Sequence, residues 1–181
     1  MIAAASQAAI ITFTGPIGTP VASTAEGAFT YSTFSGGLFR DTQGNGDLFN
    51  MEGCSSCGGG VLKVVRNDVA SGRFTFNSAD VAFQFNTVYP ISFRGYLSGV
   101  LVGTDVFQTA LGSVYTSHLS NLLSGVAIDE LRVQLDATGS TATVVDNINV
   151  SASAIPEPAT LALVGLALAG LAVRRRTKRD R

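Results

Sequence analysis

Apolar and polar residues alternate along much of the chain, and this period of two limits the folds that the chain can adopt. The alternation is clearest in residues 74–77, 81–86 and 131–136. Successive side chains of a β-strand point to opposite faces, so the pattern predicts strands with one buried face. Strands are expected at residues 10–14, 28–34, 61–66, 74–77, 81–86, 91–97, 100–109, 131–136 and 143–151.

Turn residues between these segments indicate how the strands are connected. Ser98-Gly99 separates two apolar runs by two residues, which is the spacing of a tight hairpin turn. Residues 117–124 are a weak candidate for a helix. Many short strands with turns between them predict an all-β fold in residues 9–155, an antiparallel β-sandwich or jelly roll.

The carboxyl end of the sequence has a different character. An apolar run covers residues 159–173, and six of the eight residues 174–181 are Lys or Arg. A helix over the run would span roughly 22 Å at about 1.5 Å per residue, less than the roughly 30 Å of bilayer hydrocarbon. Basic residues beside an apolar run stay cytoplasmic, and their aliphatic stems extend the span. We therefore predict a single short transmembrane helix rather than a core helix.

Two prolines precede this run, and the three elements in this order resemble the PEP-CTERM sorting signal of Gram-negative bacteria. The sorting motif corresponds to Pro156, Glu157 and Pro158, and the basic membrane stop to Arg174, Arg175 and Arg176. The resemblance implies that residues 156–181 are a sorting tail. It also implies export across the inner membrane, transient anchoring by the helix and processing by an exosortase, a membrane-embedded cysteine transpeptidase. The expected destination is the cell surface or extracellular matrix, together with exopolysaccharide.

Export also requires a signal at the amino end. Residues 1–8 contain no basic region and no long apolar stretch, but Ser6-Gln7-Ala8 has the small-x-small pattern that ends a signal peptide. We expect residues 1–8 to be the remnant of a signal peptide whose start lies upstream. The alternative is an Ala-rich amino-terminal coil.

The charges divide the chain in the same way. Residues 1–155 contain six Lys or Arg and eleven Asp or Glu, so the body is acidic and the tail basic. An acidic body argues against a nucleic-acid partner, because phosphate-binding surfaces are rich in Lys and Arg.

Part of the body also resembles a known kind of domain. Residues 74–150, chiefly through the runs 95–104 and 145–150, resemble the jelly-roll domains of many PEP-CTERM proteins and of carbohydrate-binding modules. The resemblance implies that the body helps to build or binds extracellular polysaccharide, although a fold does not by itself determine function.

One loop has the spacing of a calcium site. Oxygen-bearing side chains stand at positions one, three, five, seven and twelve of a twelve-residue stretch, with glycine at position six, as in a calcium loop. These residues are Asp41, Gln43, Asn45, Asp47 and Glu52. Phe49 at position nine and the missing flanking helices argue against an EF-hand. A structural calcium site in another context and a polar, turn-rich loop both remain open.

Asp146 suggests a second calcium site. It lies two or four residues from Val144, Ile148 and Val150, so on a regular strand it is expected to face the core with them. A buried carboxylate is costly unless it is paired or bound to a metal. Jelly-roll binding modules often hold calcium where their first and last strands meet, so Glu26 is the candidate partner. The alternative is a β-bulge that lets Asp146 reach solvent.

The remaining candidates argue against catalysis. Cys54 and Cys57 are too few for a zinc site, and in an oxidising compartment we expect a disulfide between them. His118 is the one histidine, and the chain has no Gly-x-Ser-x-Gly or phosphate loop. Asp129 and Glu130 are adjacent, so they would not oppose each other as glycosidase carboxylates do. We predict a non-enzymatic protein; the alternative is a small secreted glycan-active hydrolase that uses loop carboxylates.

Overall fold

A computed structural model describes residues 7–14, 23–41, 50–53, 59–68, 72–83, 88–110, 114–138 and 141–152. The chain divides into two compact units, Gln7–Ser153 and a second unit made of Met1–Ser6 with Ala154–Arg181. The second unit lies outside the described residues, and so does the helix expected at 159–173. Within the described part of the chain there is no helix that is long and apolar enough to cross a membrane.

The described residues form thirteen strands and no helix, which confirms the all-β prediction. The strands are β1 (Gln7–Ile11), β2 (Ser23–Glu26), β3 (Phe29–Gly36), β4 (Leu38–Asp41), β5 (Asn50–Gly53), β6 (Gly60–Arg66), β7 (Phe74–Phe83), β8 (Pro90–Leu97), β9 (Val100–Gln108), β10 (Thr116–Leu119), β11 (Glu130–Leu135), β12 (Ala137–Thr138) and β13 (Thr141–Ala152).

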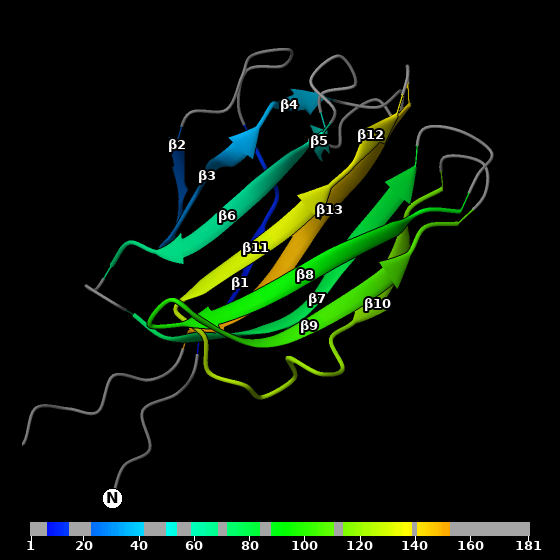
Figure 1. The fold of residues 1–181 in the computed structure, drawn as a ribbon. Coiled ribbons are helices and arrows are strands. Elements are labelled where there is room, and N and C mark those ends of the chain that lie inside the picture. The colour runs from blue at the N-terminus through cyan, green and yellow to red at the C-terminus, as the bar shows by residue number, and fades with distance from the viewer. Residues whose placement is uncertain are drawn as a thin grey trace, which may run out of the picture. The chain divides into compact units, whose positions relative to one another are not determined.

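These strands build two antiparallel sheets that face each other (Figure 1). One sheet has six strands in the order β2-β3-β6-β11-β8-β9. The other has seven, with the order β10-β7-β13-β5-β4 and with β1 and β12 also paired to β13. The predicted antiparallel β-sandwich is therefore confirmed.

Aromatic side chains fill the space between the sheets. Phe29 of β3 meets Phe74 of β7 edge to face, with ring centroids 5.3 Å apart. Phe76 of β7 stacks on Phe93 of β8 at 5.0 Å. All four side chains are fully buried. Such pairs contribute about 0.5–1.5 kcal/mol each beyond the area that they bury, so they help to lock one sheet onto the other.

The hairpin between β8 and β9 has the predicted turn. Leu97 pairs with Val100, and the two residues between them have positive φ, 52° at Ser98 and 80° at Gly99. Two consecutive positive φ values define the turn whose twist matches that of antiparallel strands. The turn prediction is confirmed.

The prediction of a helix at residues 117–124 is wrong. Thr116–Leu119 is strand β10, which pairs with β7, and a bend follows it. The buried carboxylate of Asp105, 4% exposed, holds this bend. It accepts hydrogen bonds from the hydroxyl of Ser120 (2.7 Å) and from the backbone N–H groups of Asn121 (3.2 Å), Leu122 (2.7 Å) and Leu123 (3.3 Å). These bonds satisfy the backbone donors that a helix would otherwise use.

Candidate functional site

Three basic side chains stand in one row on the outer face of the six-stranded sheet. Arg132 of β11 is the register partner of Lys63 on β6 and of Arg94 on β8. Their neighbours along each strand belong to the core, so these three point outward. We call Lys63, Arg132 and Arg94 the cationic row. It holds three of the six Lys and Arg of residues 1–155, although like charges directly opposite each other destabilise a sheet.

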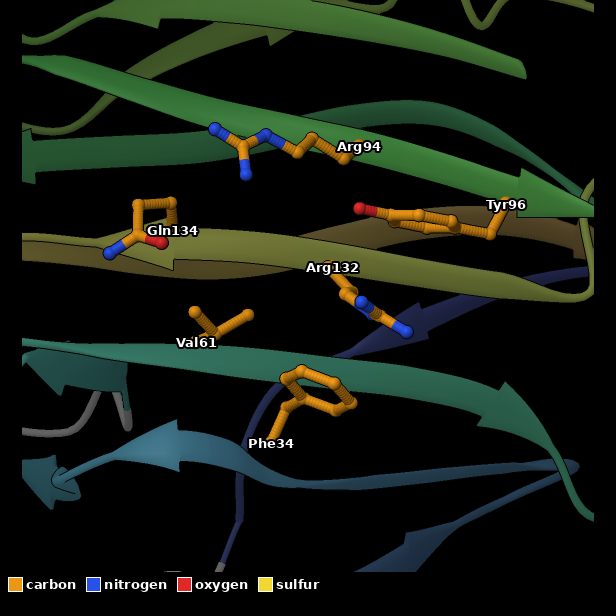
Figure 2. Close-up of a pocket in the computed structure, with 6 residues that line it drawn as sticks. All are labelled: Phe34, Val61, Arg94, Tyr96, Arg132 and Gln134. Carbon is orange, nitrogen blue, oxygen red and sulfur yellow. The ribbon is translucent and has the colours of Figure 1, made fainter. Parts of the chain in front are cut away.

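Two aromatic rings hold the middle of this row. The guanidinium carbon of Arg132 lies 3.9 Å from the ring centroid of Phe34 and 4.2 Å from that of Tyr96. Figure 2 shows the guanidinium between the two rings, and we call these three residues the Arg132 stack. A guanidinium over an aromatic face is attracted by the ring's quadrupole, which fixes its position.

Phe34 reaches this face because β3 is irregular at this point. The register between β3 and β6 shifts between Thr33 and Ser35. A bulge of this kind inserts one residue and changes the direction of its side chain. Phe34 is left 48% exposed beside the cationic row, where its ring also lies 6.0 Å from the Lys63 amino group.

The Arg132 stack borders a shallow depression of about 90 Å³. Its lining residues, all drawn in Figure 2, are Phe34, Val61, Arg94, Tyr96, Arg132 and Gln134. Pockets that enclose small molecules measure about 300–1,000 Å³, so this depression is too small to enclose a substrate. An exposed ring and a half-buried ring beside hydrogen-bond donors on an open sheet suit an extended ligand that lies across the strands.

The acidic groups near the depression already have partners. Glu130 forms an ion pair with Nε of Arg132. Asp136 accepts a hydrogen bond of 2.8 Å from the amide of Gln134. Lys63 and Arg94, in contrast, form no ion pair with any residue that the structure describes.

The sequence did not single out these residues. Lys63, Arg94 and Arg132 come from strands that are far apart in the chain, and only the register of β6, β11 and β8 places them in one row. Their outward positions in alternating strands and the scarcity of Lys and Arg in the body were the available signals.

The structure describes only part of the predicted calcium loop and neither the cysteines nor the sorting tail. Asp41 ends β4 and Glu52 lies in β5, and these two strands pair as an antiparallel hairpin. Gln43, Asn45 and Asp47 lie outside the described residues, as do Cys54, Cys57 and all residues from 153 onward. The loop and disulfide hypotheses remain predictions.

Asp146 is buried, as predicted, but it does not share the face of Ile148 and Val150 that the sequence spacing indicates. Its neighbour Val145 belongs to the core cluster, so Asp146 points to the opposite side. Asn147 has φ of 46°, and the register with β7 shifts after Asp146, which returns Ile148 and Val150 to the core. The bulge of the alternative interpretation is present, but it does not bring Asp146 to solvent, because the residue is only 2% exposed.

Asp146 nevertheless lies among negative charges. It is the register partner of Asp80, and its carboxylate accepts a 2.7 Å hydrogen bond from the backbone of Asn147. The pKa of Asp146 is raised from 3.8 to about 6, chiefly by burial; the charges of Asp80 and Glu26 add to the rise, and the hydrogen bond from Asn147 opposes it. Glu26 itself accepts bonds from the N–H and hydroxyl of Thr12, at 2.8 and 2.7 Å. Among the described side chains, no group of three or more His, Cys, Asp or Glu is arranged to hold a metal ion.

This pKa predicts an unusual pH dependence. Between about pH 4 and pH 6 the native state holds a proton on Asp146 that the unfolded state releases, so the stability contributed by this group falls as pH rises. The full shift corresponds to at most about 3 kcal/mol. Asp146→Asn should remove this loss, which urea unfolding at a series of pH values would measure. An unchanged pH profile in the variant would contradict the assignment.

The other candidates for chemistry have structural contacts. His118 of β10 is half-buried, and its ring stacks on Phe107 with centroids 5.0 Å apart. Its Nε2 lies 3.0 Å from the hydroxyl of Thr116. Asp129 accepts a 2.8 Å bond from the N–H of Ser98 in the β8–β9 turn.

The fold of this chain is similar to that of carbohydrate-binding modules of known structure. The chain is similar to a family 29 carbohydrate-binding module from Piromyces equi, with a TM-score of 0.50, 7% identity, and coverage of 82% of this chain and 91% of that chain. It is also similar to a variant of a family 29 module complexed with mannohexaose, with a TM-score of 0.48, 12% identity, and coverage of 81% and 92%. At such identities the similarity concerns the fold alone.

The comparison of sequences concerns the tail. Residues 154–176 match the PEP-CTERM protein-sorting motif. Residues 154–176 thus carry the PEP-CTERM sorting motif that the resemblance predicted. No curated protein matches the chain.

Proposed function

We propose that this chain is an exported, non-enzymatic protein of the cell surface or extracellular matrix, and that its β-sandwich binds extracellular polysaccharide. The observation that carries the proposal is the Arg132 stack, in which the exposed ring of Phe34 and the half-buried ring of Tyr96 flank a fixed guanidinium. The apolar face of a sugar ring packs on an aromatic ring, and its hydroxyls bond to donors such as those of Arg94 and Gln134. The fold shared with a carbohydrate-binding module supports this assignment.

The tail supplies the route to the surface. Under this proposal residues 1–8 are the remnant of a signal peptide, 9–155 form the binding domain, and 159–173 anchor the protein in the inner membrane of a Gram-negative bacterium. An exosortase then recognises the Pro-Glu-Pro motif within the matched residues 154–176 and releases the body. Exopolysaccharide made by the same cell would be the ligand.

Structural calcium is a separate proposal for the same domain. Glu26 and Asp146 interact electrostatically, so a cation between them would relieve their repulsion. Residues 41–52 are the alternative site. Because a bound cation favours the ionised carboxylate, millimolar calcium should abolish the loss of stability above pH 4 if Glu26 and Asp146 hold it. Retention of the pH dependence in calcium would leave that pair without a metal.

Binding to a surface of this kind can be measured by electrophoresis of the full chain, in mild detergent, through native gels that contain neutral or acidic polysaccharides. We expect at least one polymer to retard the protein, and Tyr96→Ala to weaken that binding about tenfold or more, because truncating an aromatic anchor costs over about 1.4 kcal/mol. Leu119→Ala is the matched control, since Leu119 is 81% exposed at the edge of the other sheet. Equal losses in the two variants would contradict the proposed site.

A further inference from the structure

The cationic row is out of place in this protein unless it has a ligand. Residues 1–155 carry an excess of acidic side chains, yet three of their six Lys and Arg stand side by side on three adjacent strands. Adjacent strands lie about 4.8 Å apart, so the row extends over about 10 Å, comparable to two consecutive sugar rings. The sheet itself gains nothing from such a row, because opposed like charges repel.

The contacts within the row compensate only part of this charge. Glu130 neutralises Arg132, and the rings of Phe34 and Tyr96 hold its guanidinium from both sides. Lys63 and Arg94 flank it on either side, and neither has an ion pair within the described part of the chain. Among the described residues, Lys63 and Arg94 are therefore cations without an ion pair, and they lie on either side of the Arg132 stack.

We infer that the ligand of this face is an anionic polysaccharide that carries carboxylate groups, as uronic-acid polymers do; this inference rests on the proposed function. The Arg94 guanidinium is a planar fork of donors that matches the two oxygens of a carboxylate, and Lys63 supplies a second point charge. Phe34 and Tyr96 receive the sugar rings between these charges, while Arg132, already paired with Glu130, holds the two aromatic rings in position.

The charge pattern explains how an acidic body can bind an acidic polymer. At physiological salt the screening length is about 8 Å, so carboxylates beyond that distance contribute little at the face. Asp136, whose partner Gln134 is uncharged, is the nearby negative charge that the cationic row outnumbers. Selectivity follows from the same pattern, because a neutral polymer would leave Lys63 and Arg94 without partners.

The test compares polygalacturonate with its fully methyl-esterified form, which keeps the sugar backbone and removes the charge. The full chain, in mild detergent, is titrated with each polymer. We expect binding to polygalacturonate that is at least about tenfold tighter than to the ester, and that weakens as salt is raised. The double variant Lys63→Gln with Arg94→Gln should lose this preference and the salt dependence.

The matched control is Arg73→Gln, which removes an exposed arginine immediately before β7, in the other sheet. It should bind as the parent does, and thermal unfolding should show all variants to be folded. Equal binding of both polymers, still lost in Tyr96→Ala, would overturn the inference while the proposed function stands. Absence of binding to either polymer and to neutral glycans would overturn both.

Discussion

Replacement of Pro156, Glu157 and Pro158 by alanine is expected to leave the protein uncleaved and membrane-bound. The motif lies within residues 154–176, which match the sorting motif, and proline cannot continue a helix, so Pro156 and Pro158 are expected to separate the body from the apolar run. Without this recognition element the run at 159–173 would remain an anchor. Fractionation of tagged cells, followed by comparison of gel mobility, measures the effect.

Two controls make this result specific to sorting. Ser153→Ala, which lies just before the matched residues, should be processed as the parent is. The parent protein in cells that lack exosortase should reproduce the membrane-bound, uncleaved form of the triple variant. Normal release of the triple variant would contradict the prediction that the Pro-Glu-Pro motif directs sorting.

Removal of the Asp105 carboxylate is expected to cause a large loss of stability. One buried side chain accepts bonds from a hydroxyl and three backbone N–H groups of residues 120–123, and Asp105→Ala leaves all four donors without it. Hydrogen bonds to a charged group contribute about 1.5–3 kcal/mol each, and water can reach some of the freed donors, so we expect a loss of about 3–4 kcal/mol. Denaturant unfolding would show it as a lower midpoint with an unchanged slope.

Asp129→Ala is the matched control for this variant. Asp129 also accepts a backbone hydrogen bond, but only one, from the exposed turn at Ser98. Its removal should cost about 1 kcal/mol or less. If the two variants lost equal stability, Asp105 would not be the group that holds the bend after β10.

The alternation of apolar and polar residues was sufficient to predict the long strands. In β11 the side chains of Leu131, Val133 and Leu135 are buried alternately, as the sequence indicates. The strands at β6, β8 and β9 begin and end close to the predicted residues. The short strands β2, β4, β5, β10 and β12 were not predicted, because two to four residues are too few to establish a period.

Bulges explain why the sequence spacing assigned some side chains to the wrong face of the sheet. Residues 74–83 are one strand, β7, in which the buried positions change from Phe74 and Phe76 to Ala79 and Val81; residues 84–86 of the second expected strand lie outside the described residues. The compensating irregularity on β13 includes the left-handed Asn147. Asparagine tolerates this conformation better than most residues, but the sequence alone does not say which asparagine adopts it.

The candidate site depends on long-range register, which a single sequence does not encode in any local pattern. Arg132 meets Lys63 and Arg94 only because β11 lies between β6 and β8 in the sheet. Phe34 joins them through a bulge that the alternation around residues 28–34 does not reveal. The tail, in contrast, was recognisable because its three elements are contiguous.

The central claim is that the body binds polysaccharide without cleaving it. The direct measurement is to mix the full chain with exopolysaccharide isolated from the producing cells, and to follow co-sedimentation and newly formed reducing ends in the same sample. We expect the protein to sediment with the polymer, Tyr96→Ala to remain in the supernatant, and the number of reducing ends to stay constant. Reducing ends that accumulate with the parent and not with a carboxylate variant such as Glu130→Gln would show the protein to be a glycan hydrolase and would contradict the account.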